Sequence, residues 1–481
     1  MKSCEWKIVY QNYQGMEKKA VDFLSKELGK YLVREEGVYT IYVLPCERAG
    51  GGIEKNAVLV GLYGESELIQ KYVQPNEFES DGFLVKVIAN PDNGDGRIMI
   101  VTAHDEQELF YAAVSLVDDY VPENTPWHGG VRMPQVIFDE PLNAYAYTER
   151  ADFKTRSVFT WGHPINNYRE YIENMARLKL NQLIIWNDYM PVNVEEIIDY
   201  AHSYGIEVLF GYSWGWKPGF GKNITDISDA RLQELKKEII ACYEEEYLHT
   251  RCDGIYFQSF TENKNEYVRG RLIAEAVTTL VNDTANELLT KYPNLKLQFG
   301  LHAMSVRNHL DEIKKVDKRI EILWEDCGTF PYDYAPCVND EQAFAETVEF
   351  TKKILTLRGD APVGLVFKGM MTLDWTRFVK QSGAFVLGGN SAEITAHDQR
   401  LRRGAWKNFS ADWMQYGAYA MKMLEVIAQN ALGEVNMCMA GAYDGGIYLP
   451  QALCAQMFRA RDGEYGETLK KVARRERVII G

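Results

Sequence analysis

Two rhythms of apolar and polar positions run along the chain, and one gives way to the other near residue 150. In residues 5–140, short apolar runs are mixed with amphipathic segments whose apolar residues recur at helical spacing. Strands are expected at Trp6–Tyr10, Thr40–Leu44, Ala57–Gly61, Gly82–Ile88 and Arg97–Thr102, and helices at Met16–Leu32 and Glu106–Tyr120. The turn Pro91-Asp92-Asn93-Gly94 predicts a hairpin between the last two strands. We therefore predict a small α/β domain over residues 1–145.

From about residue 154, short apolar strands alternate with long helical patterns. The strands are expected to begin near Arg156, Asn181, Ile206, Asp253, Leu295, Ile320, Val363 and Ala384. Strands that alternate with helices form parallel sheets, and eight such units in about 250 residues fit a closed (β/α)₈ barrel, or TIM barrel. An open doubly wound sheet is the structural alternative, but no GxGxxG loop follows the first strand. The pattern thus predicts a barrel over residues 150–405 and a C-terminal helical segment over residues 406–481.

Composition narrows the class of protein. Hydrophobic residues make up 46% of the 481-residue chain, and the net charge of −15 argues against a nucleic-acid partner or an anionic membrane surface. The sequence contains no apolar run of about 18 residues and no apolar secretory segment at its N-terminus, so we expect no membrane span and a cytoplasmic location. The eight cysteines are scattered without CxxC spacing, which favours free thiols over a metal site. We expect no cofactor, and homo-oligomerisation stays open.

The predicted strand ends carry most of the chemistry. Active sites of (β/α)₈ barrels lie at the C-terminal ends of the strands. Several tryptophans lie there together with amides and charged groups, and aromatic faces stack on the C–H faces of sugar rings. Packing of loops is the alternative role for each tryptophan. The residues expected to contact an oligosaccharide substrate are Trp161, Trp186, Asn187, Asp188, Tyr212, Trp214, His302, Trp324, Lys368 and Trp375.

Glu262, just beyond the fourth strand, is the candidate general acid. Next to Phe260 its carboxyl group would be partly desolvated, which raises the pKa of a carboxylic acid. A salt bridge to Lys264 or a helix-capping role is the alternative. Glycosidases need a second carboxylate, and Glu325 and Asp326 at the end of the sixth strand are the candidates. Because strand residues alternate between faces, only one of these two is expected to face the site, and the sequence leaves open which one.

Other chemistries have less support. No HExxH or P-loop motif occurs in the sequence. Lys368 at a strand end would suit a Schiff base, but the tryptophan-rich strand ends argue against it. A metal site built from His163, His302 and Asp188 has no supporting spacing. A barrel that binds carbohydrate without catalysis is the alternative from another class.

The residues also resemble a known group of enzymes. The stretch GFLVKVI…RIMIVTAHDEQELFYAAVSLVDDYV resembles the domain that precedes the barrel in glycoside hydrolase families 20, 67 and 84. The segment NYREYIENMARLKLNQLIIWND is similar to the first helix and second strand of their barrels. These families include β-N-acetylhexosaminidases and α-glucuronidases, so the resemblance implies a TIM-barrel glycosidase.

One position departs from the hexosaminidase pattern. Those families carry two adjacent acidic residues after strand four, of which one orients the substrate's N-acetyl group and the other is the acid. Here the pair is Thr261-Glu262, so only the acid matches. The lone glutamate of α-glucuronidases suits Glu262 with Glu325 or Asp326 better. We therefore predict an exo-acting glycosidase with direct inverting displacement, and a substrate-assisted β-N-acetylhexosaminidase is the alternative.

Overall fold

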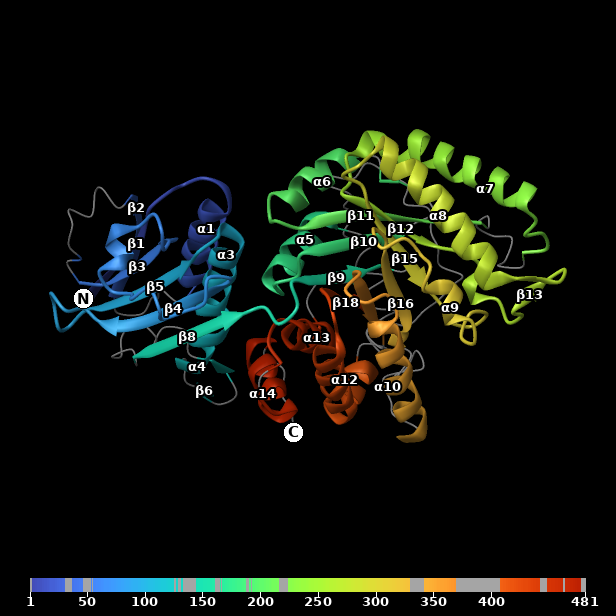
Figure 1. The fold of residues 1–481 in the computed structure, drawn as a ribbon. Coiled ribbons are helices and arrows are strands. Elements are labelled where there is room, and N and C mark those ends of the chain that lie inside the picture. The colour runs from blue at the N-terminus through green and yellow to red at the C-terminus, as the bar shows by residue number, and fades with distance from the viewer. Residues whose placement is uncertain are drawn as a thin grey trace. The chain divides into compact units, whose positions relative to one another are not determined.

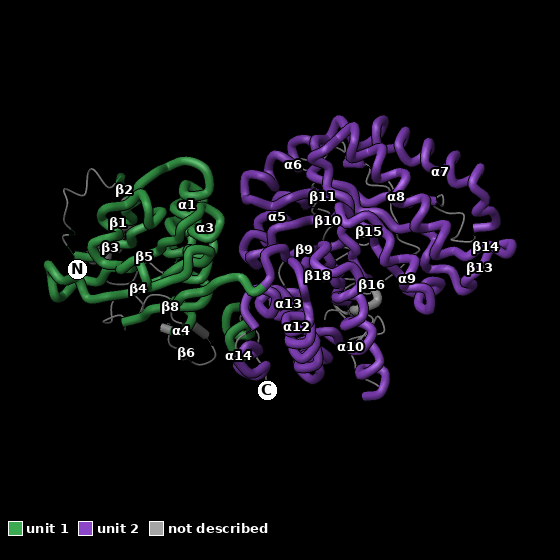
Figure 2. The backbone as a smooth tube through the Cα atoms, viewed as in Figure 1, with its two compact units in different colours: residues 1–152, 470–481 green, residues 153–469 purple. Residues whose placement is uncertain are grey.

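The chain forms two compact units in its computed structural model (Figures 1 and 2). Unit 1 comprises residues 1–152 and 470–481, and unit 2 comprises residues 153–469. The structure describes residues 2–30, 37–45, 53, 55–124, 127–128, 131–132, 144–160, 165, 167–186, 190–191, 193–215, 224–328, 341–368, 407–441, 448–461 and 463–476.

Unit 1 is built on a six-stranded mixed sheet. Its strands are β1 (Lys2–Tyr10), β2 (Gly37–Pro45), β3 (Ala57–Leu62), β4 (Gly82–Ala89), β5 (Arg97–Ala103) and β8 (Tyr145–Arg150), in the order β2-β1-β3-β5-β4-β8. The hairpin expected around residues 91–94 joins β4 and β5, which pair antiparallel. Helices α1 (Gly15–Gly29), α2 (Glu67–Gln70) and α3 (Glu106–Ser115) complete the layers, and the first and third of them pack on each other. The expected α/β domain is therefore present.

Unit 2 contains a closed barrel of eight parallel strands. They are β9 (Thr155–Phe159), β10 (Gln182–Trp186), β11 (Glu207–Ser213), β12 (Gly254–Gln258), β15 (Lys296–Leu301), β16 (Glu321–Gly328), β17 (Val363–Phe367) and β18 (Val435–Ala440). The helices between and after them are α5 (Tyr168–Arg177), α6 (Val194–His202), α7 (Asp229–Cys242), α8 (Ile273–Lys291), α9 (Leu310–Ile313), α10 (Glu341–Thr356), α12 (Ala418–Asn430) and α13 (Leu449–Arg459). The predicted TIM barrel is confirmed.

The eighth strand is where the sequence-based expectation was wrong. The barrel closes through β18, which pairs with β17 on one side and with β9 on the other. The segment beginning at Ala384, expected to be this strand, lies outside the described residues. A short apolar run can be a strand or part of a buried helix, and its pattern alone does not distinguish the two. Pairing with β9 is what identifies the residues that close the barrel. The barrel unit therefore extends into the region expected to be a separate helical segment.

Alternate residues of each barrel strand point inward and form layers. The middle layer is mostly apolar and consists of Phe159, Ile184, Leu209, Tyr256, Leu323, Val366, Cys438 and Ala440. Since inward residues recur every second position, Trp186, Gln258 and Glu325 follow these residues on the inside at the C-terminal end. Gln182 and Glu321 precede them at the N-terminal end. This parity decides which side chains share the barrel interior.

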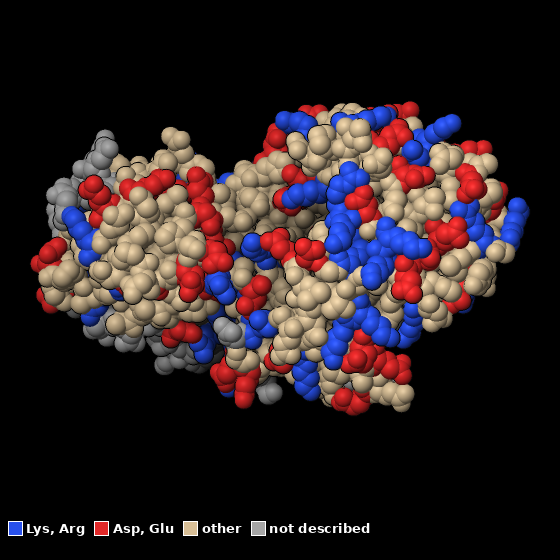
Figure 3. All heavy atoms as spheres, in the orientation of Figure 1, with Lys and Arg blue, Asp and Glu red and all other residues tan. Residues whose placement is uncertain are grey.

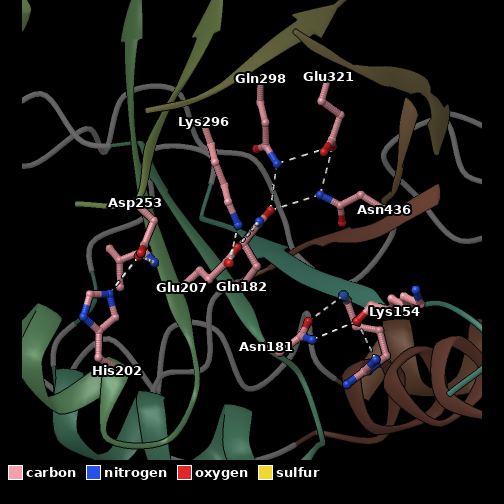
Figure 4. Close-up of polar contacts among 12 residues, drawn as sticks. Lys154, Asn181, Gln182, His202, Glu207, Asp253, Lys296, Gln298, Glu321 and Asn436 are labelled. Carbon is pink, nitrogen blue, oxygen red and sulfur yellow. Dashed lines mark hydrogen bonds and ion pairs between the residues drawn. The ribbon is translucent and has the colours of Figure 1, made fainter. Parts of the chain in front are cut away.

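A polar network fills the N-terminal end of the barrel interior (Figure 4). The amide of Gln298 donates to Gln182 Oε1 at 2.8 Å and to Glu321 Oε1 at 3.3 Å. The amide of Asn436 donates to the same two oxygens, at 3.0 and 2.9 Å respectively, and its own oxygen accepts from Ser157 Oγ. Burial raises the pKa of Glu321 to about 7, although the hydrogen bonds from Asn436 and Gln298 oppose this rise.

We expect Glu321→Gln to change how the stability of the barrel depends on pH. Because the folded state holds the Glu321 proton more tightly than the unfolded chain, its stabilising effect is full below about pH 4.5 and is lost as the pH rises through 7. Urea unfolding at pH 5 and pH 8 should show the variant gaining stability relative to the parent at the higher pH, by on the order of 3 kcal/mol. The exposed Glu245→Gln is the control, and an equal difference at both pH values would contradict the prediction.

The last helix contributes to unit 1. Helix α14 (Tyr465–Glu476) begins in unit 2, but its residues from Lys470 onward belong to unit 1. There Arg475 pairs with Asp119 at 2.6 Å, and both side chains are almost completely buried. Arg474 pairs with Glu123 at 3.2 Å in a half-exposed position. The N-terminal domain is therefore completed by residues from the opposite end of the chain.

The surface in Figure 3 carries acidic and basic side chains interspersed on both units. Many of them form exposed ion pairs, such as Lys315 with Glu312 at 2.7 Å and Lys291 with Glu244 at 3.1 Å. Among the described helices, none has the length and apolar character that a membrane crossing requires.

Candidate active site

Four of the residues expected at the site meet at the C-terminal end of the barrel interior or lie beside it. Glu262 belongs to a short 3₁₀ turn, Phe260–Glu262, that follows β12. His302 and Lys368 directly follow β15 and β17, and Glu325 lies within β16. His302, Glu325 and Lys368 are buried, whereas the Glu262 side chain is 26% exposed. Glu262 is therefore the carboxylate of this group that solvent can reach.

His302 lies between the two carboxylates. Its Nε2 is 3.0 Å from Glu325 Oε2 and 3.9 Å from Glu262 Oε2. Since both oxygens approach one nitrogen, they lie no more than about 7 Å from each other. The structure thus brings Glu262 and one of the two strand-six candidates, Glu325, to the same imidazole.

Glu325 is held from several sides. Its Oε1 accepts hydrogen bonds from the hydroxyl of Tyr256 and from the amide of Gln258. Burial alone would raise the pKa of Glu325, but His302, Lys368 and Tyr256 outweigh it and lower the pKa to about 2. Burial and the neighbouring carboxylate raise the pKa of Tyr256 well above its usual value, so its hydroxyl stays a donor. These partners therefore favour the ionised form of the buried Glu325 carboxyl.

A glycine makes room for this contact. Gly300 lies on β15 at the inward position before His302. A Cβ at Gly300 would collide with the Tyr256 hydroxyl and lie 2.6 Å from Glu325 Oε1. Tyr256, Gln258 and Gly300 were not expected at the site from the sequence. The available signal was Gln258, a polar residue that ends an otherwise apolar strand.

The turn that carries Glu262 is tied to its surroundings through the main chain. Ser259 Oγ donates to the carbonyl oxygen of Trp214 at 2.9 Å. The carbonyl oxygen of Thr261 accepts from the backbone N–H of Ser305 at 3.0 Å and from its hydroxyl at 2.9 Å. These bonds connect the loops after β11, β12 and β15 and fix the start of the Glu262 side chain relative to His302.

Trp186 is the described tryptophan that lines the barrel interior at this end. Its indole packs edge-on against Tyr256 with ring centres 5.6 Å apart, and it is only half-buried. Gly211 on the neighbouring strand leaves space for the ring, because a Cβ there would collide with it. The half-buried indole therefore lies next to Tyr256, which donates a hydrogen bond to Glu325.

Three other aromatic residues expected at the site lie elsewhere, which corrects the prediction for them. Tyr212 donates to the carbonyl oxygen of Ile239 on α7 at 3.1 Å. Trp214 is completely buried and stacks on Phe257, with ring centres 3.6 Å apart. Trp324 packs on Phe350 of α10. Strand alternation places each of them on the outer side of the barrel wall, so they support the site from behind.

The remaining expected residues fall outside what the structure describes. These are Trp161, Asn187, Asp188 and Trp375, together with the side chain of Asp326. Arg156 lies at the start of β9 and donates to main-chain oxygens of Phe153 and Lys179. It is therefore a structural residue at the opposite end of the barrel.

The segment Gly211-Tyr212-Ser213-Trp214-Gly215 has the GxSxG spacing of hydrolase nucleophile elbows. Here the glycine at 211 accommodates the Trp186 ring, and Tyr212 and Trp214 pack outside the barrel. The histidine of the site, His302, approaches Glu325 and Glu262. The spacing is thus explained by packing of the barrel wall.

Within the described residues, no group of three or more His, Cys, Asp and Glu side chains is arranged to hold a metal ion.

A small α/β domain joined to a closed (β/α)₈ barrel is the fold of solved glycoside hydrolases. The chain is similar to CpGH84B of family 84 with a TM-score of 0.52 and 11% identity, covering 97% of this chain and 70% of that one. It is similar to a family 138 enzyme targeting pectin rhamnogalacturonan II, with a TM-score of 0.51 and 10% identity. This match covers 96% of this chain and 52% of that enzyme. For BtGH115A, a family 115 4-O-methyl-α-glucuronidase, the TM-score is 0.51 and the identity is 12%. This match covers 99% of this chain and 60% of BtGH115A.

The chain thus spans about half to two thirds of the length of the last two of these proteins. No family model and no curated protein sequence matches it. At these identities the likeness concerns the fold, so the activity has to be argued from the site.

Proposed function

We propose that the protein is an exo-acting glycoside hydrolase for short oligosaccharides, with Glu262 as the general acid. The observation that carries the proposal is the placement of the partly exposed Glu262 side chain beside His302 at the C-terminal end of the barrel, where barrel enzymes have their active sites. Trp186 supplies the adjoining apolar face. Hydrolysis of a glycosidic bond needs this combination of a proton donor and a surface for the sugar ring.

The second carboxylate of the mechanism is Glu325 or Asp326. Glu325 is fully buried and uses both oxygens in contacts with protein groups, so water has no access to it. The pairing of β16 with β17 shifts register between Trp324 and Gly328, so alternation does not fix which way the residues after Glu325 face. We therefore favour Asp326 as the base that activates water. Exchange of Asp326 for Asn should abolish turnover, with azide rescue as the diagnostic of a missing base.

The structure of the Thr261 position favours direct displacement over help from an acetamido group. Thr261 is fully buried, and its main chain is held by Ser305. No carboxylate is therefore available at this position to orient an N-acetyl group. We expect the first-formed product to have the inverted anomeric configuration, as detected by proton NMR on the best substrate from a panel of nitrophenyl glycosides.

The panel should include N-acetylglucosaminide, N-acetylgalactosaminide and glucuronides. Retention of configuration together with tight inhibition by a thiazoline would contradict direct displacement and support the substrate-assisted alternative. Sugar binding without cleavage of any member, unchanged in Glu262→Gln, would contradict the enzymatic function itself.

A further inference from the structure

At the buried side of the site, Glu325 lies close to His302. General acid catalysis by Glu262 does not by itself require such a pair. Glu325 is the completely buried anion described above, and it approaches His302 Nε2 more closely than Glu262 does, at 3.0 Å against 3.9 Å. Neither Tyr256 nor Gln258 can neutralise a carboxylate, because both are uncharged donors. The charge of Glu325 must therefore be balanced by the cations that face it.

We propose that Glu325 is a positioning residue that holds His302 as an imidazolium, and that this cation stabilises the Glu262 carboxylate formed when the acid gives up its proton. The role in catalysis rests on the proposed glycosidase function. The charge state of His302 does not rest on it. Glu325 would then act on the reaction only through His302 and would not touch the substrate.

Burial and geometry support this assignment. An unpaired carboxylate at a fully buried position would be strongly destabilising, whereas an ion pair with His302 at 3.0 Å offsets much of that cost. Because pairing is reciprocal, the interaction that keeps Glu325 ionised also keeps His302 protonated. His302 is 4% exposed, so little solvent screens the pair.

The groups that face His302 come from several strands or the loops after them. Gln258 on β12, Glu262 after β12 and Glu325 on β16 face its imidazole directly, whereas Tyr256 on β12, Lys368 after β17 and Cys438 on β18 interact with Glu325. Tyr256 and Cys438 stay neutral, because burial raises the pKa of each well above its usual value. Lys368 carries a positive charge that opposes protonation of His302, so the carboxylates alone favour the imidazolium.

The cation helps an acid catalyst for a simple reason. In the transition state the Glu262 proton moves to the leaving oxygen, and a negative charge develops on Glu262. A positive charge 3.9 Å away stabilises that carboxylate in a poorly solvated site. His302 contacts both carboxylates, so its positive charge would lie directly beside the Glu262 oxygen.

The test is the titration of His302 by NMR of protein labelled in its eight histidines, with His302→Asn to assign the resonance. We expect His302 to remain protonated about 1–3 pH units above the ordinary histidine pKa of about 6.5 in the parent protein. In Glu325→Gln, which keeps the size of the side chain, its midpoint should fall to or below about 6.5. Tyr256→Phe is the matched control, since it removes a hydrogen bond to Glu325 but leaves the charge.

A neutral His302 in the parent at pH 6 would overturn the proposal, even if Glu325→Gln failed to fold. The same holds for a His302 midpoint that Glu325→Gln leaves in place. With a cleavable glycoside, the alkaline limb of the pH–rate profile should move to higher pH in Glu325→Gln, because Glu262 loses its nearest cation. If Glu325→Gln shifts the His302 midpoint but leaves the alkaline limb of the pH–rate profile in place, the role of His302 in catalysis is rejected and its charge state is not. Absence of activity in the parent would reject the proposed function and leave the charge state of His302 testable.

Discussion

Glu262→Gln is expected to lower kcat on a p-nitrophenyl glycoside by about 100-fold or more, the low end of the range for loss of a general acid. Glutamine has nearly the same shape as glutamate and retains the hydrogen-bonding surface near His302, but it has no proton to give to the leaving oxygen. KM should change little if, as proposed, the sugar is bound mainly through Trp186 and its neighbours. Steady-state kinetics at the pH optimum measures both constants.

The leaving group provides a sharper diagnosis of the same variant. A dinitrophenolate leaves without protonation, so the loss on a dinitrophenyl glycoside should be far smaller than on a glycoside with a poorer leaving group. Glu266→Gln is the matched control, because Glu266 lies four residues further along the same loop, where it contacts Asn308 and His309. Equal losses on both substrates would show that Glu262 holds the structure rather than donating a proton.

The second large effect concerns stability. We expect Arg475→Leu to lower the free energy of unfolding of unit 1 by about 3–5 kcal/mol, because it leaves Asp119 buried without its closest cation. Lys471, 3.7 Å from the second oxygen of Asp119, compensates only in part since it is more exposed. The loss should appear as a lower urea midpoint in unfolding followed by circular dichroism.

Arg474→Leu on the same helix is the control for this experiment. Its pair with Glu123 is about 40% exposed on both sides, and such pairs contribute about 0–1 kcal/mol. The double variant Asp119→Leu with Arg475→Leu should recover much of the loss, because two apolar side chains replace a buried ion pair without an unpaired charge. A double variant as unstable as Arg475→Leu would show that the arginine acts mainly by packing.

The local pattern of the sequence was sufficient for the framework of the fold. Seven of the eight barrel strands begin within one residue of the expected positions, from β9 at Thr155 to β17 at Val363. Each of them is a short apolar segment between turn residues and helical patterns. Such a segment can be recognised as a strand from its own residues and their immediate neighbours in the chain. The sequence also predicted strand-end positions for three of the candidate residues: His302 and Lys368 directly follow strands, and Glu262 lies in the turn after β12. The C-terminal ends of the strands are where barrel enzymes carry their catalytic groups.

The tertiary structure decided which strands pair with each other and which side of the barrel wall each strand residue faces. Closure of the barrel selected Val435–Ala440 as the last strand, since these are the described residues that pair with both β17 and β9. Inward parity selected Glu325 for the interior and placed Trp324, its neighbour in the chain, against α10. From the sequence, either Trp324 or Glu325 could face the interior, because a shift of one position exchanges the two faces of a strand. Contacts across the barrel decide which of the two does.

The same reason applies to the charged groups. The sequence shows Glu262, His302 and Glu325 at separations of 40 and 23 positions, with no sign that one imidazole nitrogen approaches both carboxylates. It also gives no sign that Arg475 completes the N-terminal domain by pairing with Asp119. Charge pairing between distant segments depends on where the backbone brings them, and hydrophobic periodicity carries no information about it. Local chemistry determined the elements of this protein, and long-range packing determined which of its carboxylates are buried, paired or open to solvent.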